Sequence, residues 1–255
     1  MTTITLSFDG TTVITNAEKK VDFQNEIDSL SCKKNIIIDI GKSKFYLPNY
    51  EEDLVQGSVY NGRTYFEFGY LLETQKYLPK KPTIIDIGAN IGNHTLFWAN
   101  ECSAKKIYAF EPMPYTFKIL KKNIKINNLQ ERVQLYNIGL SEKETKGVIK
   151  SFDKTNIGGT RLTEAPSDKK GNIKLKTLDS FNFDDKKIDL IKIDVEGMDY
   201  LVLTGAIKTI KKYKPLILIE SFPEEYNITK RILLALGYKI IKEFNSYEYL
   251  YAYDK

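Results

Sequence analysis

TIIDIGANIGNHT, residues 83–95, is the stretch of sequence that decides the fold of this chain. It opens with the apolar, β-branched run Thr83-Ile84-Ile85, turns at Gly88, passes Gly92 and continues into the helix-like pattern Leu96-Phe97-Trp98-Ala99. The stretch therefore predicts a strand, a glycine turn and a helix. Such a turn directs backbone N–H groups at an anion, and its glycines allow a ligand to approach the main chain closely.

The spacing of the two glycines narrows the choice of ligand. Gly88 and Gly92 are spaced GxxxG, so the middle glycine of the dinucleotide fingerprint GxGxxG is absent and Asn90 stands in its place. This spacing argues against a pyrophosphate cofactor. It suits the carboxylate and adenosine of S-adenosylmethionine.

A carboxylate follows at the distance that a ribose contact requires. The run Ile107-Tyr108-Ala109-Phe110 predicts the next buried strand, which ends at Glu111, about 25 residues after Asp86. An acid at an offset of roughly 20 residues is typical of a carboxylate that binds two ribose hydroxyls. The alternative is an ordinary strand-end glutamate in solvent.

Four motifs in order resemble those of the FkbM family of S-adenosylmethionine-dependent methyltransferases. They are DIGANIG at residues 86–92, Phe110-Glu111-Pro112, Leu178-Asp179, and IKIDVEG at residues 191–197, and the similarity runs from about Tyr60 to about Tyr238. The resemblance implies the class I methyltransferase fold, which is a doubly wound, mostly parallel seven-stranded sheet with an antiparallel C-terminal hairpin. It also implies O-methylation of sugars and other hydroxylated metabolites.

Length and composition fit one sizeable α/β domain with a small N-terminal α+β addition. The chain has 255 residues, of which 42% are hydrophobic and 28% are charged, enough to bury a core. We expect residues 1–58 to form an N-terminal cap or interaction region and residues 59–255 to form the methyltransferase domain. The N-terminal region contains short strand-like pieces and a predicted helix from Ala17 to Leu30. It could shape the substrate site or a subunit contact in a homo-oligomer.

Charge and cysteine content exclude several classes of partner. Lys+Arg number 38 against 33 Asp+Glu, but the lysines are scattered as pairs, which is typical of solvated faces, so we expect no nucleic-acid partner. Cys32 and Cys102 lack CxxC spacing and indicate neither a zinc site nor a disulfide framework. The sequence has no leader pattern and no apolar run of membrane-spanning length. We therefore expect a soluble, cytoplasmic protein without a membrane partner.

The segment before the first core strand supplies two candidates. A turn at Asn61-Gly62 is followed by a predicted helix that ends before Pro79. In folds of this kind that helix crosses the cofactor cleft. Glu67 is then a candidate partner for the cofactor's ammonium group and Arg63 for a substrate anion, although both could be plain surface residues.

Beyond the glycine turn, helices and strands alternate, as expected for a parallel sheet. A turn that begins at Asn137 would lie beside the adenine. The polar stretch TNIGGTR, residues 155–161, interrupts the alternation and predicts a glycine-rich loop. Loops at the carboxyl edge of such a sheet carry specificity, which makes Asn156 and Arg161 candidate substrate contacts. A plain hairpin tip is the alternative.

The fourth strand carries the residues expected to perform the chemistry. A parallel strand buried on both faces is normally apolar, yet Lys192, Asp194 and Glu196 occur at alternating positions and so point to one side. Either Asp194 or Glu196 is predicted to be the base or a substrate anchor, with Lys192 as electrostatic partner. A purely structural ion pair is the alternative. The next strand ends at Glu220, which we expect to face the same crevice and to contact substrate.

The turn and its neighbours provide the remaining cofactor candidates. His94 is the only histidine, and it could bind the methionine carboxylate, act as a general base, or simply begin a helix. Together with the residues already named, the predicted cofactor contacts are Glu67, Asp86, Gly88, Asn90, Gly92, Asn93, His94, Glu111, Pro112, Asn137 and Asp194.

A divalent metal is a further expectation, because like charges packed in a crevice repel. Asp194, Glu220 and Glu196 could hold magnesium, manganese or iron through oxygen ligands, and such an ion would lower the pKa of the acceptor hydroxyl. The alternative is that Lys192 and backbone amides satisfy the acids.

The sequence as a whole predicts methyl transfer from S-adenosylmethionine to a hydroxyl of a small metabolite, above all a sugar or sugar nucleotide. Methylation of nucleic acid or protein and a catalytically silent S-adenosylmethionine-binding module are the alternatives. Enzymes that methylate nucleic-acid amino groups usually carry an (N/D)PPY-like motif where this chain has Asp194-Val195-Glu196-Gly197. That difference disfavours nucleic acid.

Overall fold

The computed structural model describes residues 3–8, 11–16, 23, 26–27, 30–32, 34–166 and 171–254. The chain divides into two compact units, Met1–Leu30 and Ser31–Lys255. In the first unit, β1 (Thr3–Phe8) and β2 (Thr11–Asn16) pair as an antiparallel hairpin. The helix predicted from Ala17 to Leu30 lies largely outside the described residues. The domain boundary between residues 58 and 59 stays a prediction.

The second unit is built around a seven-stranded sheet with the order β14-β15-β13-β12-β5-β6-β7. Five neighbouring strands are parallel, and β15 lies antiparallel between β13 and β14. The predicted doubly wound, mostly parallel sheet with an antiparallel C-terminal hairpin is therefore confirmed. The strands are β5 (Thr83–Ile87), β6 (Lys106–Phe110), β7 (Val133–Tyr136), β12 (Leu190–Ile193), β13 (Leu216–Glu220), β14 (Tyr238–Glu243) and β15 (Glu248–Tyr253).

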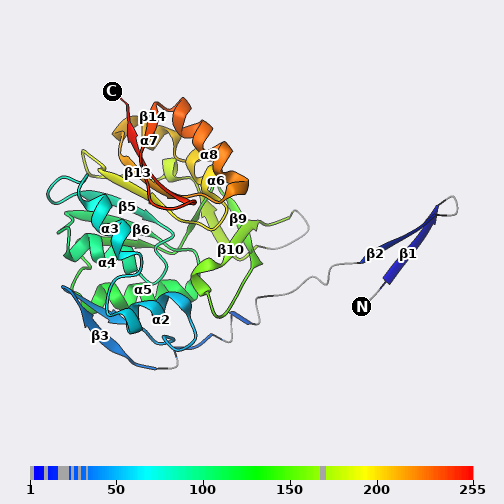
Figure 1. Ribbon diagram of the computed structural model, residues 1–255, viewed down its shortest axis with the longest axis horizontal. Coiled ribbons are helices and arrows are strands. Elements are labelled where there is room, and N and C mark those ends of the chain that lie inside the picture. The colour runs from blue at the N-terminus through cyan, green and yellow to red at the C-terminus, as the bar shows by residue number, and fades with distance from the viewer. Residues whose placement is uncertain are drawn as a thin grey trace. The chain divides into compact units, whose positions relative to one another are not determined.

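Helices cover both faces of this sheet. Figure 1 shows α6, α7 and α8 on one side of it and α4 and α5 on the other. The apolar β-branched strand residues, such as Ile84, Ile85 and Ile191, are fully buried between these layers. The helices are α4 (Asn93–Asn100), α5 (Pro114–Ile126), α6 (Asp199–Thr204), α7 (Ile207–Tyr213) and α8 (Pro223–Ala235). Within the described parts of the chain, no helix has the length and apolar character needed to cross a membrane.

Two helices stand where the sequence predicted a turn followed by one long helix. They are α2 (Leu54–Gly62) and α3 (Phe68–Gln75), so the prediction was wrong about where helix begins. The Asp53 side chain caps α2 by accepting a hydrogen bond from the Gln56 N–H at 3.1 Å, a start signal that was overlooked. Glu67 has a left-handed backbone, with φ of 58°, and separates the two helices.

A second sheet of four strands is inserted before β12, in the order β10-β9-β11-β8. The stretch TNIGGTR, residues 155–161, was predicted to be a glycine-rich loop and forms the irregular tip of this sheet, but the strands of the sheet were not predicted. These strands are half-exposed and rich in lysine, so they lack the apolar run that marks a buried strand. The elements are β8 (Gly139–Leu140), β9 (Thr145–Ser151), the 3-10 turn η1 (Ile157–Gly159), β10 (Arg161–Glu164), β11 (Ile173–Lys176) and the 3-10 turn η2 (Leu178–Ser180).

A short hairpin of β3 (Ile37–Ile40) and β4 (Ser43–Tyr46) is held against α5 by asparagine side chains. Asn123 accepts a hydrogen bond from the Tyr46 N–H at 2.6 Å and donates to the Ile91 carbonyl at 2.8 Å. Asn127 accepts from the Lys44 N–H at 2.8 Å and donates to the Lys44 carbonyl at 2.6 Å. The two amides thus satisfy backbone groups of β4 that no neighbouring strand reaches.

Candidate active site

A cavity of about 320 Å³ opens at the carboxyl ends of β5, β6, β12 and β13. This is the edge at which parallel α/β sheets bind ligands. Its walls are the glycine turn after β5, the segment after β6, the end of β12, the N-terminus of α2 and the η1 tip of the inserted sheet. The cavity therefore brings together segments from most of the second unit.

Gly88 allows the two central strands to meet at the floor of this cavity. Its backbone has φ of 76°, and a Cβ added there would lie 1.7 Å from the Asp194 carbonyl oxygen. Only glycine fits so close an approach at a positive φ. The end of β5 and the end of β12 are consequently in direct contact.

The Glu111 carboxylate is fixed at one end of the cavity. It is 5% exposed and accepts hydrogen bonds from the N–H groups of Asn90 and Met113 and from the Thr116 hydroxyl, each at 2.8 Å. Burial raises the pKa of Glu111, and these three hydrogen bonds oppose that rise. The carboxylate is thus oriented rigidly beside the glycine turn.

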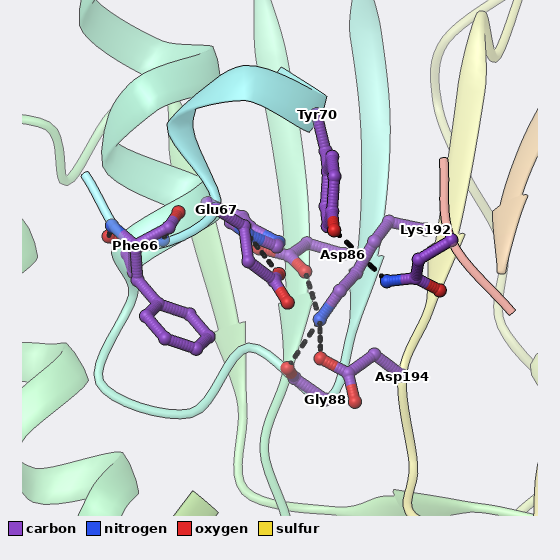
Figure 2. Close-up of polar contacts among 10 residues, drawn as sticks. Phe66, Glu67, Tyr70, Asp86, Gly88, Lys192 and Asp194 are labelled. Carbon is purple, nitrogen blue, oxygen red and sulfur yellow. Dashed lines mark hydrogen bonds and ion pairs between the residues drawn. The ribbon is translucent and has the colours of Figure 1, made fainter. Parts of the chain in front are cut away.

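Lys192 is the central charged residue of the site. Figure 2 shows its ammonium between Asp86, Gly88 and Asp194; the Nζ lies 2.9 Å from Asp194 Oδ2, 3.7 Å from Asp86 Oδ1, and donates to the Gly88 carbonyl at 2.8 Å. Burial alone would lower the pKa of Lys192, but the two carboxylates outweigh it and the pKa is raised. Lys192 therefore stays charged.

Three carboxyl groups, those of Asp194, Glu196 and Glu220, gather next to Lys192, with ligand oxygens within 4.8 Å of one another. Burial opposes ionisation of Asp194, yet the Lys192 ammonium holds its pKa below the ordinary value. Burial and the neighbouring Asp194 charge raise the pKa of Glu220 well above its usual range, so Glu220 carries the proton of a hydrogen bond with Asp194. Burial, followed by Asp194, raises the pKa of Glu196 to about 7.

Glu67 and His94 form a second polar group at the cavity wall. Glu67 Oε2 lies 3.2 Å from His94 Nε2, and the His94 ring packs at an angle against Trp98 with centroids 6.5 Å apart. His94 belongs to the first turn of α4, and Glu67 precedes α3. Two different elements thus place these side chains together.

The η1 tip closes the cavity opposite Lys192. Its Ile157 N–H donates to Asp53 Oδ1 at 3.0 Å, and the Leu54 N–H donates to the Thr155 carbonyl at 2.8 Å. Gly158 packs so tightly on the glycine turn that an added Cβ would lie 2.5 Å from the Asn90 side-chain nitrogen. The tip and the start of α2 are therefore tied to each other over the cavity.

The structure places most of the predicted site residues in one cavity. Those that line it are Glu67, Gly88, Asn90, Asn93, His94, Glu111, Pro112, Asn156, Lys192, Asp194, Glu196 and Glu220. The others do not line it: Arg63 packs over the Tyr60 ring, Arg161 over the Phe222 ring, and Asn137 donates to the Glu111 carbonyl. Asp86 and Gly92 do not line the cavity either, and Asp86 pairs with Lys192.

Sequence reasoning missed several residues at the site. Leu54 and Val55 line the cavity, and the capping residue Asp53 before an apolar pair could have revealed their helix. Thr116, five residues after Glu111 in the sequence, donates a hydrogen bond to its carboxylate, and no motif indicates this contact. Glu248 lies directly opposite Glu220 in the β13–β15 pair, and burial raises its pKa to about 9. Only strand pairing brings these two glutamates together.

Comparisons with known proteins identify methyltransferases as relatives of this chain. The sequence model of the methyltransferase FkbM domain matches residues 86–251. Methyltransferase sdnD from Sordaria araneosa is 30% identical, over 50% of this chain and 61% of its own length. Methyltransferase 1 from Beauveria bassiana is 29% identical, over 50% of this chain and 59% of its own length. The chain thus spans about three fifths of each of these curated relatives.

A solved structure agrees on the fold. Methyltransferase FkbM from Methylobacillus flagellatus KT superposes with a TM-score of 0.50 at 21% identity, over 68% of this chain and 44% of that chain. The family match begins at the end of β5 and reaches β15, so it includes the glycine turn, Glu111, the acid cluster and the antiparallel insertion. It extends over more than half of the chain, and the protein therefore belongs to the FkbM family of methyltransferases, with the class I methyltransferase fold.

Proposed function

We propose that this methyltransferase transfers the methyl group of S-adenosylmethionine to a hydroxyl of a small metabolite, a sugar above all. One observation carries the proposal. A single cavity joins the oriented Glu111 carboxylate at the glycine turn to Glu196, a carboxyl group whose pKa is about 7. Such a group accepts a hydroxyl proton efficiently at neutral pH.

The residues present fit S-adenosylmethionine. The Gly88 turn leaves no side chain between the ligand and the main chain, Glu111 presents a fixed acceptor for ribose hydroxyls, and Glu67 presents a carboxylate for the ammonium group. When bound, the cofactor supplies a methyl group on a sulfonium, which is already a strong electrophile. The protein's tasks are therefore orientation and removal of the acceptor proton.

Glu196 is the base in this proposal, and its neighbours define its role. Asp194 is held ionised by Lys192 and Glu220 holds a proton, so neither is free to take another at neutral pH. The Glu196 backbone has φ of 54°, an uncommon left-handed conformation for a residue other than glycine. Its carboxyl group lines the cavity together with those of Asp194 and Glu220, and we assign it to the acceptor.

The charges of the cavity favour an acceptor without phosphate. Among the described residues that line it, the only cationic side chain is Lys192, which is already bonded to Asp194 and Gly88, while four acidic side chains besides Glu111 are present. A diphosphate would meet these acids, and Arg161, whose charge acts on Glu196, packs over the Phe222 ring and does not line the cavity. We therefore favour a sugar over a sugar nucleotide.

The direct test is a screen of acceptors with labelled S-adenosylmethionine and detection of product by mass spectrometry. Free sugars and glycosides, the matching nucleotide sugars, and RNA are compared under identical conditions. Methyl ether formation on the unphosphorylated sugars is expected. Transfer to RNA alone would contradict the proposal.

Glu111→Ala is expected to weaken S-adenosylmethionine binding by about 1 to 3 kcal/mol, the order of a lost hydrogen bond to a charged group. Isothermal calorimetry measures the change. Thr116→Val is the matched control, because it removes only one hydrogen bond that supports the carboxylate and should cost less. Equal affinity in Glu111→Ala and the parent would remove Glu111 from the ribose site.

The rate should depend on the ionisation of Glu196. A base must be deprotonated, so a group with a pKa of about 7 makes kcat/KM rise with pH below about 7 and level off above it. Glu196→Gln should lower kcat by about 10²- to 10⁴-fold and abolish that limb. Glu131→Gln, at an exposed position, is the control. A limb that persists in Glu196→Gln would assign the base elsewhere, with His94 the first alternative.

We further propose that the acid cluster works without a divalent metal. The Lys192 ammonium, 2.9 Å from Asp194 Oδ2 and 3.7 Å from Asp86 Oδ1, already supplies a positive charge beside these acids. Exhaustive EDTA treatment should therefore leave activity unchanged, with no stoichiometric metal in elemental analysis. Loss of activity that magnesium, manganese or iron restores would show that Asp194, Glu196 and Glu220 bind a metal after all.

A further inference from the structure

The side-chain amide of Asn93 forms hydrogen bonds with both backbone polar groups of Phe66, which lies between α2 and α3. The Phe66 N–H donates to Asn93 Oδ1 at 2.9 Å, and Asn93 Nδ2 donates to the Phe66 carbonyl at 2.9 Å. Asn93 is the first residue of α4 and is 5% exposed. The start of α4 is thereby joined to the segment that leads into α3.

The segment that Asn93 grips contains an unfavourable backbone conformation. Glu67 follows Phe66 and has φ of 58° and ψ of 31°, which residues other than glycine seldom adopt. Such conformations persist only where the surroundings fix them, and they concentrate at functional sites. The paired hydrogen bonds to Phe66 are a fixing contact immediately before the strained residue.

This backbone conformation directs the Glu67 side chain into the cavity. Glu67 occupies the cap position of α3, yet its side chain makes no capping hydrogen bond to that helix. Its carboxylate lies instead 3.2 Å from His94 Nε2 and lines the cavity. Figure 2 shows it beside the Asp86–Lys192 ion pair. The Glu67 side chain therefore does not cap α3, and its carboxylate lies in the site instead.

The segment that begins at Phe66 is also fixed at its other end, at Tyr70. Asn245, in the turn between β14 and β15, donates from Nδ2 to the Tyr70 hydroxyl oxygen at 3.1 Å. The Tyr70 ring also packs on Phe244, with centroids 5.2 Å apart. Residues 66–70 are thus held between α4 and the C-terminal hairpin.

We infer that Asn93 is a positioning residue, which aims the Glu67 carboxylate at the ammonium group of the methyl donor. The inference rests on the proposed use of S-adenosylmethionine. Phe66 engages the Asn93 Oδ1 and one hydrogen of its Nδ2, and in this proposal Asn93 acts through Glu67. Asparagine suits this task because its amide has a donor and an acceptor side by side.

A double-mutant cycle tests this inference, with affinity for S-adenosylmethionine and S-adenosylhomocysteine measured by calorimetry. Asn93→Ala and Glu67→Gln should each raise Kd about tenfold, the order of one lost charge-assisted contact. The double variant should differ from Glu67→Gln by less than about twofold, because residues that act through one another are not additive. Both ligands carry the ammonium group, so both should lose affinity equally.

Asn127→Ala is the matched control. It removes an equivalent pair of hydrogen bonds, here to Lys44 at the β4–α5 contact, together with one from Nδ2 to the Asn123 carbonyl at 2.8 Å. It should lower Tm as Asn93→Ala does and leave Kd unchanged. If Asn93→Ala does not fold, Asn93→Asp is used in the cycle, since it keeps the acceptor for the Phe66 N–H and loses the donor.

The outcomes separate the two claims. Single effects that multiply in the double variant, or an unchanged Kd in Asn93→Ala, overturn the positioning role while the proposed function stands. A parent protein that binds neither ligand overturns the proposed function itself. Equal loss in Asn93→Ala and Asn127→Ala would reduce Asn93 to a stability contact and so also overturns the inference.

Discussion

The buried ammonium of Lys192 is the interaction on which the site depends. An isolated charge at the centre of a parallel sheet would cost several kcal/mol, and here two carboxylates and the Gly88 carbonyl offset that cost. These partners come from β5, from the glycine turn and from the end of β12. Loss of Asp194 would leave Lys192 only the more distant Asp86 carboxylate, and Lys192 and Asp86 are paired across β12 and β5, so the ion group also fixes the register in which the two central strands meet.

The same charge sets the roles of the acids around it. Burial raises the pKa values of Glu220 and Glu196, and the negative Asp194, which Lys192 keeps ionised, raises them further. Three carboxyl groups in one crevice thereby become an anion, a proton donor and a group that titrates near neutral pH. Burial and the distance from one ammonium give three carboxyl groups of the same chemistry different pKa values.

Asparagine amides perform a structural task at the start of α4 and at the C-terminal end of α5. Asn123 and Asn127 bind backbone groups of β4, and Asn93 binds those of Phe66. In each case a side chain supplies hydrogen bonds to backbone groups that lie outside the main sheet. Two of these contacts attach a hairpin to the surface of the sheet's helices, and the third holds the strained residue Glu67 at the cavity.

The sequence by itself determined the strands of the main sheet from Thr83 onward, the glycine turn, the acids at three strand ends and the antiparallel hairpin, because periodicity and glycine spacing are local properties. Only the tertiary structure decided what those residues contact. The Asp53 contact with Ile157, the Asn93 amide on Phe66 and the Glu220–Glu248 pair all join positions far apart in the chain. Pairing across such distances depends on three-dimensional packing, so no local pattern in the sequence encodes it.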